Sequence, residues 1–301
     1  MYDQRMGGRA KILGGVAGGT RWELALRPPD ARLRPYVREL MGYTERTSAV
    51  LRRREFPGPQ AVVIFDLGPP IRIGDDGAAV TFPRGFIAGV DQTYTMTEHD
   101  GFSSGIQCNL TPVGARLFFG LPMSELAGRV VPFPDIAGRV HADLALRLID
   151  ACDWDARLDL IERLLLERLS SPSPRSRMVS WAVARIQDSG GAVDITDLAR
   201  ELGYSAKHTI DLFRDQVGVA PKLFARIVRF DRLMSHLRAG GRGTWTDLAL
   251  TFGYYDQAHL IRDVRQFTGL TPIQARGALL DFSALAPAEV SSVQDPPLAR
   301  L

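Results

Sequence analysis

The sequence predicts an α+β protein of two domains, in which a β-rich N-terminal domain is followed by an all-α C-terminal domain. The chain has 301 residues, and one hydrophobic core seldom serves much more than about 250–300 residues. Short β-branched runs occupy the first half, whereas apolar residues at helical spacing dominate the last third. A Ser/Pro run at residues 171–176 lies between them and cannot continue a helix.

The predicted boundaries follow from these shifts in composition. A Gly-rich N-terminus without a sustained apolar run predicts a disordered leader instead of a secretory signal. The last residues, rich in Ala, Pro and Ser, predict a flexible tail. The resulting division is a leader at 1–20, a β-rich domain with C-terminal helices at 21–170, a linker at 171–176, a helical domain at 177–277 and a tail at 278–301.

Individual elements of the N-terminal domain follow from local patterns. Ala61–Leu67 is an apolar, β-branched run bounded by Pro and Gly, which is typical of a buried strand. Asp155–Leu169 carries Leu and Ile at three- and four-residue steps, which predicts an amphipathic helix that pairs between subunits or packs on its own domain. Further strands are predicted at Gly85–Val90, Thr93–Thr97 and Gly105–Leu110, and short helices at Val113–Phe119, Ser124–Ala127 (with Ser124 as N-cap) and Leu144–Ile149.

The composition excludes several classes of protein. The chain is 45% hydrophobic and 24% charged, as in ordinary soluble proteins, and no run reaches the roughly 20 apolar residues of a membrane span. Cys108 and Cys152 are its two cysteines. They exclude a disulfide framework, favour a cytoplasmic setting, and are either core residues or a redox pair. His99 and His141 lack the clustered ligands of a metal-dependent enzyme, so we expect no metal or cofactor.

An internal repeat governs the C-terminal third. Thr196-Asp197-Leu198-Ala199 recurs as Thr246-Asp247-Leu248-Ala249, and Gly203-Tyr204 recurs as Gly253-Tyr254. One inserted residue, Tyr255, shifts the later matches by one position. These matches pair His208 with His259, Ile210 with Ile261, Arg214 with Arg265, Gly218 with Gly269 and Pro221 with Pro272.

Each repeat has the parts of a helix-turn-helix unit. Thr196 and Thr246 are predicted N-caps of a short first helix, and a glycine ends that helix in the left-handed conformation. Ser205 and Asp256 are predicted N-caps of the second helices, Ala206–Val217 and Gln257–Thr268, which in such units enter the major groove. The predicted structural residues are Leu198, Ala199, Gly203, Tyr204, Phe213, Gly218, Pro221, Leu248, Ala249, Gly253, Tyr254, Gly269 and Pro272.

A connecting helix is predicted from Pro221 to about Arg238, because an apolar stripe at helical spacing ends at two glycines. Eighteen residues span roughly 27 Å, and successive major grooves on one face of DNA lie about 34 Å apart. A rigid helix of this length can hold two reading helices in adjacent grooves of promoter DNA. Between Arg177 and Arg276 there are 14 basic and 10 acidic side chains, an excess that permits DNA binding without arguing for it.

The repeat resembles the AraC/XylS family of transcriptional regulators. The resemblance lies in Ala249, Gly253-Tyr254, His259-Leu260-Ile261-Arg262 and Gly269-Leu270-Thr271-Pro272, and it extends over about Arg177–Gly277. It implies a seven-helix double helix-turn-helix domain that binds DNA. Phe56-Pro57-Gly58-Pro59-Gln60 and the run from Asn109 to Arg116 are similar to the N-terminal sensor or dimerisation domains of some actinobacterial members.

By this resemblance, seven residues face the bases: Lys207, Ile210, Asp211, Gln257, Ala258, His259 and Arg262. Arg262 can fork onto guanine and Gln257 onto adenine, whereas Ile210 can meet only a thymine methyl. Either the second helix dominates specificity, or the two helices share the reading, or the contacts are mostly to phosphate. His208 and His259 fit a structural or phosphate-contacting role as well as base reading. Predicted phosphate contacts are Arg214, Lys222, Arg226, Arg229 and Arg265, although Arg226 and Arg229 fit an ordinary solvated face equally well.

These observations predict a transcriptional regulator without enzymatic activity. Its expected partners are double-stranded promoter DNA and RNA polymerase, with a small-molecule effector and a homodimer through the N-terminal domain as further expectations. Activation is commoner than repression in the family that the repeat resembles. The competing interpretation, a DNA-repair or other enzyme with an appended DNA-binding module, lacks the Pro-Cys-His-Arg setting of an activated cysteine.

Overall fold

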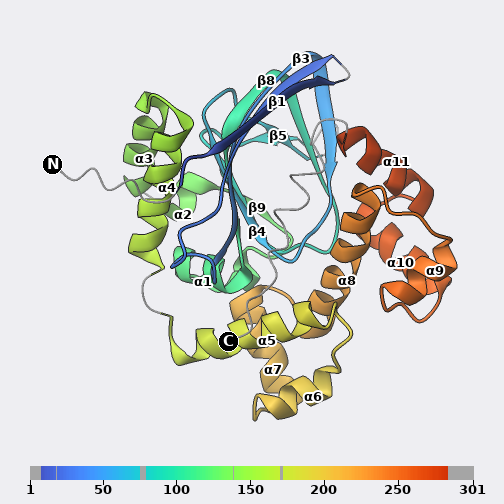
Figure 1. The fold of residues 1–301 in the computed structure, drawn as a ribbon. Coiled ribbons are helices and arrows are strands. Elements are labelled where there is room, and N and C mark those ends of the chain that lie inside the picture. The colour runs from blue at the N-terminus through green and yellow to red at the C-terminus, as the bar shows by residue number, and fades with distance from the viewer. Residues whose placement is uncertain (1–7, 18, 75–78, 138, 170–171, 284–301) are drawn as a thin grey trace.

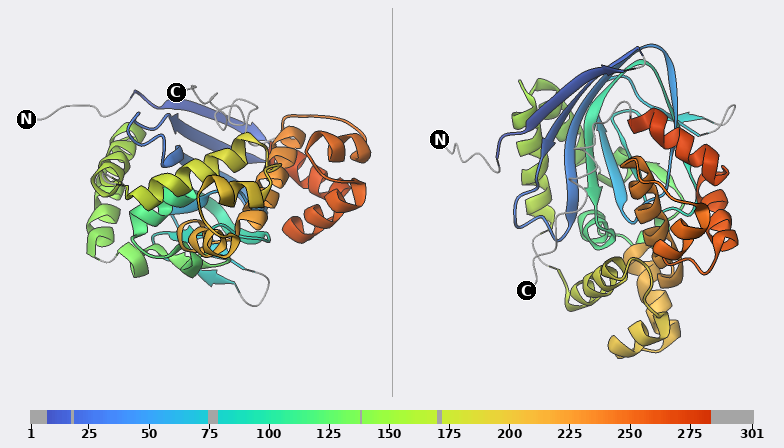
Figure 2. Two further views of the ribbon diagram at one scale, coloured as in Figure 1. Left: turned by 90° about the horizontal axis from the view of Figure 1, so that it is seen from below. Right: turned by 45° about the vertical axis from the view of Figure 1, so that its right-hand side comes forward.

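A computed structural model of the chain describes residues 8–17, 19–74, 79–137, 139–169 and 172–283. A curved antiparallel sheet forms the body of the N-terminal part, with α3 and α4 along its outer side (Figure 1). The helices after residue 172 lie below and to one side of the sheet in Figure 1, and two further views show the same arrangement (Figure 2). The predicted α+β class and the order of its two parts are confirmed.

The sheet follows the strand order β1-β2-β3-β8-β4-β7-β9, with β5 pairing with β6 and β8 beside this path. Every pairing is antiparallel. The strands are β1 (Lys11–Ala17), β2 (Thr20–Arg27), β3 (Val37–Glu55), β4 (Ala61–Asp66), β5 (Arg72–Ile73), β6 (Val80–Thr81), β7 (Phe86–Ala88), β8 (Thr95–Leu110) and β9 (Val130–Pro132).

The start of the sheet corrects the predicted leader. Residues 11–17 form strand β1, which pairs along its whole length with β2, so the prediction of a disordered leader is wrong there. Residues 1–7 lie outside the described part of the chain. The predicted strands at 93–97 and 105–110 are the two ends of one long strand, β8, which pairs with β3 on one side and β4 on the other.

Helices of the N-terminal part cover one face of the sheet. They are α1 (Pro112–Phe119), the 3-10 turn η1 (Met123–Glu125), α2 (Phe133–Ala137), α3 (Arg139–Asp150) and α4 (Trp154–Arg168). Ser124 lies inside η1, whose N-terminal flanking residue is Pro122, so the predicted capping role of Ser124 is wrong. Thr111 caps α1, with its Oγ1 accepting a hydrogen bond from Gly114 N at 3.0 Å.

Helix α4 packs on its own domain. Leu158, Ile161 and Leu165 are at most 2% exposed and belong to the core beneath the sheet. The carboxylate of Glu162, also fully buried, pairs with the Arg27 guanidinium on β2 at 3.0 Å and accepts a hydrogen bond from Asp30 N at 2.9 Å. Because a buried charge is tolerated only when it is paired and hydrogen-bonded, this contact fixes α4 against the sheet.

Seven helices make up the C-terminal part of the described chain: α5 (Pro174–Asp188), α6 (Ile195–Glu201), α7 (Ala206–Val217), α8 (Pro221–Arg238), α9 (Trp245–Thr251), α10 (Gln257–Thr268) and α11 (Pro272–Ser283). Ser173 caps α5, so a helix begins inside the predicted linker, where Pro174 occupies the first turn that tolerates proline. Helix α11 extends to residue 283, into the predicted tail, and residues 284–301 lie outside the described part.

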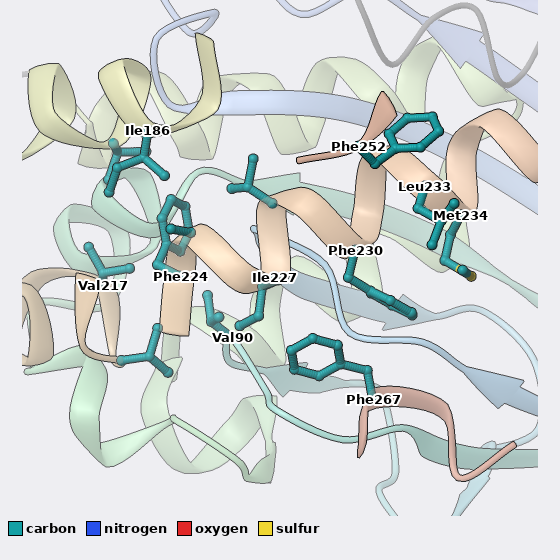
Figure 3. Packing of buried hydrophobic residues seen from close by; sticks show 14 of the residues in the cluster. Val90, Ile186, Val217, Phe224, Ile227, Phe230, Leu233, Met234, Phe252 and Phe267 are labelled. Atoms are coloured by element: carbon teal, nitrogen blue, oxygen red, sulfur yellow. The ribbon is translucent and has the colours of Figure 1, made fainter. Parts of the chain in front are cut away.

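The helical domain and the sheet domain share buried contacts. Val90, after β7, is 1% exposed and belongs to the same core as Phe224 and Ile227 of α8 (Figure 3). Phe56, after β3, meets Phe230 of α8 edge-on, with ring centroids 6.2 Å apart. The long helix α8 therefore packs against both the helices of its own domain and the loops of the sheet.

Candidate nucleic-acid interface

The first helix-turn-helix unit consists of α6 and α7. Helix α6 is capped by Asp194, whose Oδ1 accepts hydrogen bonds from Thr196 N at 2.7 Å and Asp197 N at 3.1 Å. The predicted cap Thr196 is therefore wrong, because the acidic side chain two residues earlier reaches the free amides first. Gly203 adopts φ +73° at the turn, and Ser205 caps α7 as predicted.

The second unit repeats this geometry with α9 and α10. Thr244, and not the predicted Thr246, caps α9 by accepting a hydrogen bond from Asp247 N at 3.1 Å. Gly253 adopts φ +72°, and Asp256 caps α10 by accepting a hydrogen bond from His259 N at 2.7 Å. Both second helices, and the connecting α8, have the predicted bounds.

The two turns differ in their tyrosines. Tyr254 is 3% exposed and lies in the core of the second unit, where burial raises its pKa. Tyr204 is 36% exposed and packs against His208, with ring centroids 4.3 Å apart and the rings tilted by 55°. Both tyrosines are predicted structural residues of their turns, but only Tyr254 fills the core, whereas Tyr204 lies at the surface.

The predicted base-facing residues fall into two groups by exposure. Lys207, Asp211, Gln257, Ala258 and Arg262 are exposed on the first two turns of α7 and α10, whereas Ile210 and His259 are half-buried. Gln257 accepts a hydrogen bond from Thr246 Oγ1 at 3.0 Å, and Arg262 donates one to Ala258 O at 3.3 Å. These exposed contacts leave the ends of both side chains in reach of a partner.

His259 is held from several sides. Its Nδ1 accepts a hydrogen bond from Tyr255 N at 3.4 Å, its ring meets Tyr254 edge-on at 5.3 Å, and its Nε2 lies 3.9 Å from Asp263. This packing favours the structural role for His259 over base reading.

Two of the five predicted phosphate contacts are engaged inside the protein. Arg226 on α8 pairs with buried Asp263 of α10 at 2.7 Å and also donates to Gln266 Oε1 at 2.6 Å. Arg229 donates to Gly191 O at 2.9 Å, and its guanidinium lies over the Tyr254 ring at 5.2 Å. The other three, Arg214, Lys222 and Arg265, are exposed.

Some residues at this surface are absent from the sequence-based set. Tyr255 stands immediately before α10 and is 88% exposed, and its status as the one inserted residue in the repeat was the available signal. Arg54 on β3 donates a hydrogen bond to Thr268 O, at the end of α10, at 2.9 Å, and stacks over Tyr94 at 3.9 Å. No local pattern in the sequence predicts the contact between Arg54 and Thr268, because these residues are 214 positions apart.

The two cysteines of the N-terminal part lie in different surroundings. Cys108 is 1% exposed in the core of the sheet, and burial raises the pKa of its thiol, which opposes formation of a reactive thiolate. Cys152 is exposed, and both thiols are free. Among the described residues no group of three potential metal ligands occurs, and none of the described helices is long and apolar enough to cross a membrane. The side chain of His141 lies outside the described set.

Comparison with known families matches the two parts of the chain separately. Residues 198–278 match a family described as a helix-turn-helix domain, and residues 26–132 match one described as a domain of unknown function (DUF6597). No curated protein matches the chain.

Among solved structures, ToxT from Vibrio cholerae O395 is similar at 10% identity over 77% of this chain and 97% of its own, with a TM-score of 0.44. The same protein bound to (E)-4-(8-methylnaphthalen-1-yl)but-3-enoic acid gives a TM-score of 0.46 at 10% identity, over 77% and 98% of the two chains. The AraC-like transcriptional activator CuxR gives 0.32 at 15% identity, over 77% and 87%.

Two capped helix-turn-helix units joined by one buried helix, together with the matched family, define a DNA-binding transcription regulator. The residues of the repeat resemble the AraC type, so the C-terminal part of the chain is a helix-turn-helix domain similar to those of AraC-family regulators.

Proposed function

We propose that this regulator binds promoter DNA site-specifically by placing α7 and α10 in successive major grooves, and that its N-terminal domain responds to a small-molecule effector. The observation that carries the proposal is the equivalence of the two units: the same glycine conformation at each turn, a side-chain cap on each second helix, and exposed first turns on both. Helix α8 joins them through a continuous buried face.

The two units are unequal readers. Gln257 and Arg262 offer the bidentate hydrogen bonds that distinguish adenine and guanine, whereas Asp211 and half-buried Ile210 offer little to a base edge. Arg214, Lys222 and Arg265 are exposed and supply phosphate contacts. Arg226 and Arg229 serve the scaffold instead, because their guanidinium groups are bonded within the protein.

Selection of bound sequences from a random double-stranded DNA pool tests this function. The full-length protein should enrich one motif with two half-sites about one helical turn apart. Arg262→Ala should lose base preference at one position of one half-site, at a cost of about 1–3 kcal/mol. Arg147→Ala, which removes an exposed arginine from α3, is the matched control and should leave the motif intact. An unchanged motif for Arg262→Ala would contradict the assignment of α10.

The remaining partners follow from the class of protein. A regulator that docks beside a promoter acts by contacting RNA polymerase, and we propose that contact here. Homodimerisation would use α3, where Leu146 and Ile149 are 59% and 55% exposed, because α4 is occupied by its own domain. Sedimentation of the full chain over a range of concentrations tests this, and a monomer at tens of micromolar (a dimerisation free energy of about 6 kcal/mol or weaker on the standard scale) would exclude a stable dimer.

A further inference from the structure

The sheet has one face packed on helices and one face turned away from them. Leu40, Ile106 and Val63, on β3, β8 and β4, belong to the core beneath α4. Successive side chains of a strand alternate between the two faces of a sheet. The residues next to these along each strand therefore point to the opposite side of the sheet, which we call the inner face. Figure 1 shows the sheet curved, with α3 and α4 along the other side.

Three residues lie in register across the inner face. Tyr43 of β3 pairs with Gly105 of β8, which pairs in turn with Asp66 of β4. A Cβ atom on Gly105 would lie 2.7 Å from Tyr43 Oη, so the tyrosine hydroxyl occupies the space that a side chain at 105 would need. The glycine therefore lets the hydroxyl extend along the row toward Asp66.

Asp66 is buried without compensation. The residue is 8% exposed, and neither of its carboxylate oxygens has a hydrogen-bond partner. A buried carboxyl group left unpaired is costly, and such a group in a folded protein calls for an explanation in an ion or ligand that completes it. Consistent with this environment, burial raises the pKa of Asp66 to about 7.

Other charges on the inner face do not supply the missing partner. Glu45 accepts hydrogen bonds from Arg53 Nη1 at 2.7 Å and from His99 Nε2 at 3.3 Å. Arg53 and His99 are therefore engaged with the Glu45 carboxylate. Glu39 is 7% exposed and accepts one hydrogen bond, from Asn109 Nδ2 at 2.7 Å, while its Oε1 has no partner. The face thus carries a surplus of acidic groups.

We propose that the inner face around Asp66 binds a small organic cation with at least two N–H donors, a primary ammonium or an amidinium, as the effector of this regulator. The inference rests on the proposed effector response and names its chemical class. A forked N–H donor satisfies both carboxylate oxygens at once, and such charge-assisted pairs are the strongest hydrogen bonds in proteins. The Tyr43 ring and hydroxyl, in the same row, offer a cation an aromatic face and an acceptor.

Calorimetric titration of the full-length protein at pH 8 tests the proposal with four probes. Benzamidinium and benzylammonium carry the required cation, and benzamide and benzyl alcohol are their neutral counterparts. Both cations should bind and both neutral probes should not. Asp66→Asn should weaken cation binding roughly 10–100-fold, the range for a lost hydrogen bond to a charged group. Asp143→Asn, at an exposed site on α3, should leave it unchanged.

Proton release gives a readout that needs no variant. At pH 7 the wild-type protein should release about half a proton per bound cation, because Asp66 is about half protonated there and the cation favours its ionised form. The titratable group in the same row as Asp66 is Tyr43 of β3. The hydrogen-bonded group of Glu45, His99 and Arg53 lies farther along β3 and β8. Titration in two buffers of different ionisation enthalpy measures the release, and its absence would count against Asp66 as the binding group.

Three outcomes would overturn the proposal: binding of the neutral probes as tightly as the cations, cation binding that Asp66→Asn leaves intact, or no binding of either cation up to about 10 mM. None of these requires DNA. Band-shift titration with the selected DNA motif is done separately, so failure of DNA recognition and failure of the cation site are distinguishable results.

Discussion

The substitution Asp66→Asn should stabilise the protein at alkaline pH. A group whose folded pKa lies above its unfolded value stabilises the fold only while it is protonated, and this contribution disappears as the pH rises through the folded pKa. For Asp66 the two values are about 7 and 3.8. Since one pKa unit corresponds to 1.36 kcal/mol, this carboxyl group costs the fold about 4 kcal/mol above pH 7 and less than half of that at pH 5.

Asparagine occupies the same space without a charge, so its contribution should not change with pH. The difference in unfolding free energy, Asp66→Asn minus wild type, should therefore rise by about 3 kcal/mol between pH 5 and pH 8. Urea unfolding followed by circular dichroism at pH 5, 6, 7 and 8 measures it. Asp143→Asn, on the exposed surface of α3, is the control and should show a flat difference. A flat difference for Asp66→Asn as well would refute the account of an uncompensated buried carboxylate.

Four further substitutions test the DNA-binding domain. Asp263→Ala should destabilise it by about 1–3 kcal/mol, because it removes the buried acceptor of Arg226; unfolding at neutral pH with little change would show the pair to be dispensable. Gly203→Ala should cost only about 1 kcal/mol, since nothing lies within 4 Å of a Cβ there, whereas Gly191→Ala should cost clearly more because its Cβ would lie 2.2 Å from Ala225 O. Equal melting temperatures for the two variants would contradict this geometry. Arg265→Ala should reduce the slope of log K against log salt by about 1, and an unchanged slope would remove Arg265 from the phosphate contacts.

The helical domain could be predicted nearly to the residue because its determinants are local. Helices α7, α8 and α10 each begin at a side-chain cap or a proline and end near a glycine, and these signals act within a few positions of the chain. The repeat also helped, because the alignment of the two units gave the same helix boundaries in each. The first-helix caps were misplaced because two polar residues, two positions apart, could each accept from the free amides, and only the geometry decides between them.

The sheet was predicted poorly for the opposite reason. Strand β3 alternates a core-facing residue such as Leu40 with inner-face residues such as Tyr43 and Glu45, and its second half is rich in arginine. A strand with polar residues on its inner face lacks the apolar run that marks a buried strand. Asp66 is the last residue but one of the predicted strand Ala61–Leu67. Its burial depends on Gly105 and Tyr43, which are distant in sequence and adjacent only across the sheet.

The contacts between the domains bear on how an effector signal could reach DNA. The end of α7 packs against α1 and η1, where Met123 O lies within 3.0 Å of a Cβ built on Gly218. The end of α10 is tied to the sheet through Arg54 and Thr268. Helices α7 and α10 are therefore each held by the N-terminal domain at the C-terminal end, while their N-terminal turns stay exposed. Arg54 belongs to β3, the same strand that carries Tyr43 of the inner face. A change in the curvature of β3 would move the anchor of α10, which we propose as the better base reader, before it moved α7.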